Sequence, residues 1–141
     1  MSPVVVYVLT GLAAVVVVLT RLRLRRSSRG AGRADIARGP VAVHTVAGVL
    51  ALAGWSTFLL AGDSLSEDRA SQLGIAALVL WWVTALAGLL ILARWLPTRG
   101  RHAAPAAEDS WSDGPGLSVL GHVGLVVGVA LFTYAYLLKI V

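Results

Sequence analysis

Two histidines lie inside long apolar segments, and they are the residues of this sequence best suited to chemistry. His44 follows Pro40 by four residues, near the start of the apolar segment 40–61, and His122 lies about five residues into the segment 117–138. A helix rises 1.5 Å per residue, so both rings should lie about 6–10 Å from the same end of their helices. Imidazole nitrogens bind haem iron, zinc and copper.

The number of ligands decides between these metals. Zinc and copper sites usually take three or more ligands. The chain has no Cys, and the apolar segments contain no Asp or Glu to supply the rest. A haem needs one nitrogen from each side and an open slot between the rings for the porphyrin. We therefore predict His44 and His122 as ligands of one haem b, with Gly48, one turn after His44, leaving room for a flat group.

Each histidine also has a simpler interpretation. A histidine within two turns of a helix end can bond to lipid headgroups, water or a neighbouring carbonyl. A single such histidine does this more often than it binds a metal. The third histidine, His102, lies in a polar segment with no supporting pattern, and we expect it to be solvated.

The elements that must position the two histidines follow from composition. Hydrophobic residues make up 57% of the 141 residues, charged residues only 13%, and mean hydropathy is +0.81. About 20 apolar residues of helix cross a bilayer. Four segments without a charge qualify: 3–20, 40–61, 71–93 and 117–138. They predict an all-α protein whose single domain, 1–141, is an integral membrane bundle of four antiparallel helices.

Charge then orients this bundle. Of the 12 basic residues, ten fall in two segments, 21–39 and 94–116, whereas the short connection between the second and third spans is acidic. The positive-inside rule places the basic segments in the cytoplasm and both termini outside. Ala-, Arg- and Val-rich usage is typical of a bacterium with a GC-rich genome, so we expect a multi-pass protein of the inner (plasma) membrane.

The connecting segments suggest partners. The cluster Arg21, Arg23, Arg25 and Arg26 is suited to anionic lipid headgroups, although it is also explained as a topology signal alone. No aromatic residues or folded basic module accompany it, so nucleic acid is not expected. The segment 94–116, with its Ala, Pro and acidic residues, is interpreted as a flexible cytoplasmic linker.

Other residues of the spans have structural interpretations. Trp81 and Trp82 are adjacent near the middle of the third span, so they cannot face the same neighbour. One of them either lines a lipophilic cavity or fills volume against lipid, a partner or the Ala- and Gly-rich helices. Gly124 and Gly128 form a small-xxx-small pair suited to close helix contact.

The segments His44-Thr45-Val46-Ala47-Gly48 and Gly121-His122-Val123-Gly124 each open an apolar helix. In this respect the chain resembles the small four-helix b-type membrane cytochromes and the membrane anchor subunits of respiratory enzymes. The resemblance covers two helices of four. Many of those proteins bind two haems with four histidines, whereas this chain has two in its spans. The resemblance implies electron transfer with a quinone or a partner subunit.

A second function stays open. The chain is small, has no soluble enzyme-like domain and contains no nucleotide or zinc-protease motif. We therefore expect no independent enzymatic activity. The alternative to a haem protein is a non-catalytic accessory or scaffold subunit of a larger membrane complex. A transporter is disfavoured, because no span carries a charge and no repeat relates the two halves.

Overall fold

The computed structural model describes residues 1–27, 38–95 and 116–141, with the side chains of 19–27, 38, 94, 95 and 116–118 left out. The segments 28–37 and 96–115, which hold most of the two predicted basic segments, lie outside the described residues. The described part is entirely helical apart from short turns and chain ends, so the all-α prediction is confirmed. The helices are α1 (Pro3–Ser27), α2 (Arg38–Ala61), η1 (Gly62–Ser64), α3 (Glu67–Trp95) and α4 (Gly116–Leu137).

Helix boundaries follow local chemistry. Pro3 begins α1, where a missing N–H costs nothing, and the Ser2 hydroxyl accepts a hydrogen bond from the Val4 amide at 3.3 Å. Glu67 and Asp68 begin α3, where negative charge favours the helix dipole. α1 continues to Ser27, so the first residues of the predicted basic segment, 21–27, are helical. Leu and Arg are good helix formers, and no Gly or Pro interrupts them there.

Three helical stretches are long and apolar enough to cross a membrane: Gly39–Ser64, Glu67–Ala93 and Val119–Leu137. The described apolar part of α1, Pro3–Val18, is shorter than this length. By length and composition, α2, α3 and α4 are therefore the helices that could span a membrane. Whether α1 also crosses belongs to the proposals below.

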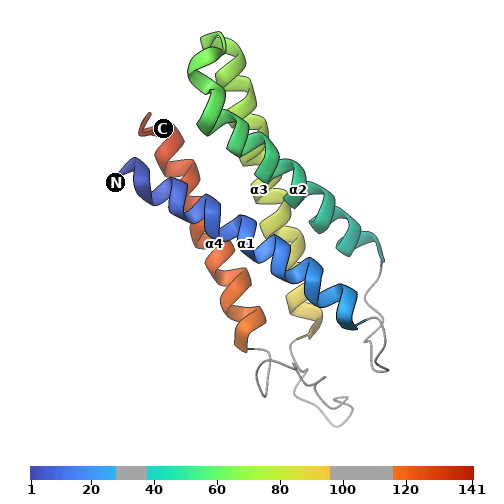
Figure 1. The fold of residues 1–141 in the computed structure, drawn as a ribbon. Helices are drawn as coiled ribbons and strands as arrows, with labels where there is room; N and C mark the ends of the chain where they lie inside the picture. The colour runs from blue at the N-terminus through green and yellow to red at the C-terminus, as the bar shows by residue number, and fades with distance from the viewer. Residues whose placement is uncertain (28–37, 96–115) are drawn as a thin grey trace.

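The helices form a bundle in which α2 and α3 make a tightly packed hairpin (Figure 1). α3 also packs on α4, and α1 touches α2 and α4, so α2 and α4 lie on a diagonal of the bundle. In Figure 1 the two chain ends lie toward the same end of the bundle as the α2–α3 turn. Small residues permit the close approach within the hairpin, since a Cβ at Gly54 would lie 3.4 Å from the Cβ of Ala77.

The core is built from small residues and large aromatic rings. Its buried members are Val6, Ala51, Trp55, Ala77, Leu78, Trp81, Ala85, Val129, Phe132 and Ala135. The Phe132 ring lies between two indoles, with ring centroids 5.1 Å from Trp55 and 5.7 Å from Trp81. Trp81 is therefore a core residue. Its neighbour Trp82 lies on a different face, 37% exposed, and donates a hydrogen bond to the Thr133 hydroxyl at 3.2 Å.

Candidate functional site: a histidine pair beside α3

The structure brings the two span histidines together. The rings of His44, from α2, and His122, from α4, have centroids 6.1 Å apart and planes inclined by 33°. The similar depth predicted from the sequence is therefore observed across the diagonal of the bundle. Both side chains are partly buried. The pairing depends on α3, which lies between α2 and α4.

His44 is fixed by a hydrogen bond to α3. Its Nδ1 lies 2.9 Å from the backbone carbonyl oxygen of Thr84. A carbonyl only accepts, so Nδ1 carries the proton and donates, which leaves the lone pair of the neutral ring on Nε2. Metal-binding histidines commonly have this arrangement, because a hydrogen bond at one nitrogen sets the tautomer and the orientation of the ring.

The side chain of Thr84 also faces α2. Its hydroxyl donates to the carbonyl of Leu80 at 2.8 Å, so the side chain folds back along α3. The methyl group, Cγ2, then lies 3.3 Å from the place where a Cβ at Gly48 would be. Gly48 therefore faces the Thr84 side chain, and the open space expected beside it for a flat group is already occupied.

Gly88 of α3 is the glycine that lies against the histidine pair. A Cβ at this position would lie 2.7 Å from Cδ2 of His122, 3.2 Å from its Nε2 and 3.1 Å from Cε1 of His44. These distances place the missing Cβ against both rings at once. Sequence reasoning missed Gly88 because it considered glycines only on the histidine helices.

The separation of the two rings matches that of two imidazoles on one metal atom, but their surroundings leave no room for a macrocycle. Metal–nitrogen bonds are about 2 Å and an imidazole centre lies about 1 Å behind its nitrogen, so a linear pair has centroids about 6 Å apart. That agrees with the 6.1 Å observed. A porphyrin extends about 4 Å from its iron in every direction of its plane. The backbone of α3 at Gly88 lies within that radius, so the predicted slot is closed in this arrangement.

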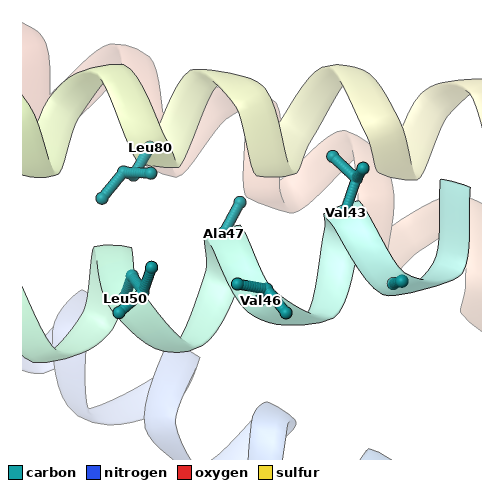
Figure 2. A pocket seen from close by; sticks show the side chains of 6 residues that line it. Val43, Val46, Ala47, Leu50 and Leu80 are labelled. Carbon is teal, nitrogen blue, oxygen red and sulfur yellow. The ribbon is translucent and has the colours of Figure 1, made fainter. Parts of the chain in front are cut away.

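A second feature near the pair is apolar. A shallow groove of about 360 Å³ runs along the outside of the α2–α3 hairpin, with Leu80 on the α3 side (Figure 2). Its α2 wall consists of Ala42, Val43, Val46, Ala47 and Leu50. The groove presents almost only carbon, so it is suited to a hydrocarbon chain and offers no polar group for chemistry.

Three tyrosines lie at the opposite end of the bundle and differ in exposure. Tyr7 and Tyr134 are about half exposed, which is typical of aromatic residues at a membrane interface. Tyr136 instead packs inward, with its ring 5.6 Å from Phe58 and its hydroxyl donating to the Ser71 carbonyl at 3.1 Å. The absence of a side chain at Gly74 makes the space for this ring.

Comparison with protein-family models, curated proteins and solved structures found no match for this chain.

Proposed function

We propose that the chain is a four-helix membrane protein in which His44 and His122 hold one haem b for electron transfer. The observation that carries the proposal is the convergence of two imidazoles, from two different helices, at a centroid distance of 6.1 Å. The fixed tautomer of His44 supports it, because Nδ1 is used for Thr84 and Nε2 keeps its lone pair. The haem would supply one-electron chemistry, and the chain would hold it and shield it from water.

The proposal requires a change in α3. The porphyrin does not fit while Gly88 lies against both rings, so the proposal requires α3 to lie farther from α2 and α4 when haem is bound. A glycine at position 88 keeps the required displacement small, since a side chain there would project into the space beside the two histidine rings.

The orientation of the chain in the membrane is part of the proposal. We infer that α1 crosses the bilayer as well, with both termini and the α2–α3 turn outside. The support is the clustering of ten basic residues in the two connections on the other side. On this topology, both histidines lie toward the cytoplasmic face of the inner membrane, where a quinone or a partner subunit would exchange electrons with the centre.

A reduced-minus-oxidised visible spectrum tests the haem directly. The protein is produced with added haem precursor, purified in mild detergent and compared with His44→Leu, His122→Leu and His102→Leu. We expect an α-band from the wild type and His102→Leu, and none from the other two. No α-band from correctly folded wild-type protein with full haem supply would refute the haem proposal.

A second candidate, an accessory subunit, is favoured by α4. Gly121, Gly124 and Gly128 share one face of this helix, and nothing lies within 4 Å of the Cβ position at any of them. The expected close packing of the Gly124–Gly128 pair is therefore not made within the described chain. Such a face suits a helix of another subunit. Co-purification of a partner at fixed stoichiometry, lost in Gly124→Leu but retained in Leu120→Ala, would support this function.

A further inference from the structure

Gly88 lies one turn along α3 from the carbonyl to which His44 is bonded. The Nδ1 of His44 is 2.9 Å from the Thr84 carbonyl oxygen, and Gly88 follows Thr84 by four residues within the continuous helix α3. We infer that Gly88 is a positioning residue: without a side chain there, the His44 ring reaches that carbonyl, keeps its proton on Nδ1 and presents Nε2 to a ligand. The inference rests on the proposed function only in taking that ligand to be haem.

Helix geometry explains why residue 88 matters for the carbonyl of residue 84. In an α-helix this carbonyl accepts the amide hydrogen four residues later, and its oxygen keeps a second lone pair. A helical side chain leans toward the N-terminus and covers the preceding turn. A side chain at position 88 would therefore cover the second lone pair of the Thr84 carbonyl, whereas glycine leaves it accessible to His44.

The distances around Gly88 agree with this role. A Cβ at this position would lie 3.1 Å from Cε1 of His44, the ring atom bonded to Nδ1, and 2.7 Å from Cδ2 of His122. Contacts this short require the rings or α3 to move apart. Hydrogen bonds between N–H and O fall within about 2.7–3.2 Å, so a shift of a few tenths of an ångström is enough to weaken the bond from His44 to Thr84.

The bond selects one of the two forms of the neutral ring. A neutral imidazole carries its proton on either Nδ1 or Nε2, and in free histidine the form with the proton on Nε2 is the more stable. Haem iron binds the nitrogen that has no proton. Because Nδ1 of His44 donates to Thr84, the lone pair is already on Nε2 in the ligand-free protein, and binding needs no transfer of the proton between nitrogens.

Nuclear magnetic resonance of the ligand-free protein tests this inference without haem. Full-length protein with ¹⁵N-labelled histidine is placed in detergent micelles at alkaline pH, where imidazole is neutral, and long-range ¹H–¹⁵N correlations distinguish the two tautomers. Signals of the three histidines are assigned with the variants His44→Leu and His102→Leu. We expect His44 of the wild type to carry its proton on Nδ1.

Gly88→Ala is the decisive variant, because it leaves every histidine in the sequence. The ratio of the Nδ1–H to the Nε2–H tautomer of His44 should fall about five-fold or more, as the loss of one hydrogen bond implies. Gly124→Ala is the matched control on α4, because nothing lies within 4 Å of its Cβ position, and it should leave the ratio unchanged. An Nε2–H tautomer in the wild type, or an equal ratio in wild type and Gly88→Ala, overturns the inference.

Circular dichroism and gel filtration establish that each variant is folded. If Gly88→Ala does not fold, the double variant Gly88→Ala/His122→Ala is compared with His122→Ala, because removing the His122 ring removes the shorter contact. The same fall in the tautomer ratio is expected between these two variants, and an equal ratio in both overturns the inference.

A haemin titration of the same wild-type sample separates this inference from the proposed function. An Nδ1–H tautomer with no α-band supports the positioning role of Gly88 and refutes the haem proposal. An α-band with an Nε2–H tautomer in the ligand-free protein supports haem and refutes the positioning role.

Discussion

Thr84 holds α2 at two points, since its carbonyl oxygen lies 2.9 Å from Nδ1 of His44 and its methyl group packs against Gly48. One residue of α3 thus sets both the orientation of a candidate ligand and the distance between the two helices. The side chain cannot turn away easily, because its hydroxyl is bonded to the Leu80 carbonyl and a β-branched residue in a helix has few rotamers.

We predict that Gly48→Ala destabilises the protein and that Thr84→Ser relieves the effect. The added Cβ would lie 3.3 Å from Thr84 Cγ2, an overpacked contact that costs about 1–3 kcal/mol and exceeds the gain in helix propensity of about 1 kcal/mol. Serine lacks that methyl group but keeps the hydroxyl and the carbonyl. Unfolding of the four members of the double-mutant cycle in detergent measures the coupling. Additive effects would contradict the packing argument.

Among the aromatic residues of the core, Phe132 should be the one whose truncation destabilises the protein most. Its ring is 2% exposed and lies against the indoles of Trp55 and Trp81. Phe132→Ala leaves a cavity between them, and we expect a loss of about 3 kcal/mol with a shift of the tryptophan emission maximum. Leu120→Ala is the control, because Leu120 is 68% exposed on the same helix. A similar loss in both variants would show that the effect is not one of core packing.

The sequence predicted the helices and the histidine pair well, for a physical reason. Apolar runs of spanning length and the shared end of their helices determine depth, and His44 and His122 indeed lie side by side. It did not predict which glycine adjoins the pair. That depends on the rotation of α3 about its axis and on the fold-back of Thr84, neither of which leaves a periodic signal. The inward position of Tyr136 likewise depends on another helix, because Gly74 of α3 makes the space for its ring.

The C-terminus of α4 offers a local test. Lys139 has φ 49°, and the amides of Lys139 and Ile140 donate to the carbonyls of Tyr136 and Ala135, the paired bonds of a Schellman ending. A left-handed conformation costs a residue with a Cβ about 1 kcal/mol. Lys139→Gly should therefore slow amide hydrogen exchange in the last turn about five-fold, as that free energy implies. Lys139→Ala removes the charge but keeps the Cβ, so it should give no such slowing. Equal slowing in both would implicate charge instead.

The crossing by α1 can be tested with single cysteines, because the chain has none of its own. Ser2 precedes α1, Ser64 lies in the exposed turn between α2 and α3, and Ser112 falls in the basic connection before α4. With four spans and both termini outside, a membrane-impermeant maleimide added to intact cells should label Ser2→Cys and Ser64→Cys. It should label Ser112→Cys only after permeabilisation. If α1 does not cross, Ser2→Cys will behave like Ser112→Cys, and the four-span topology will be wrong.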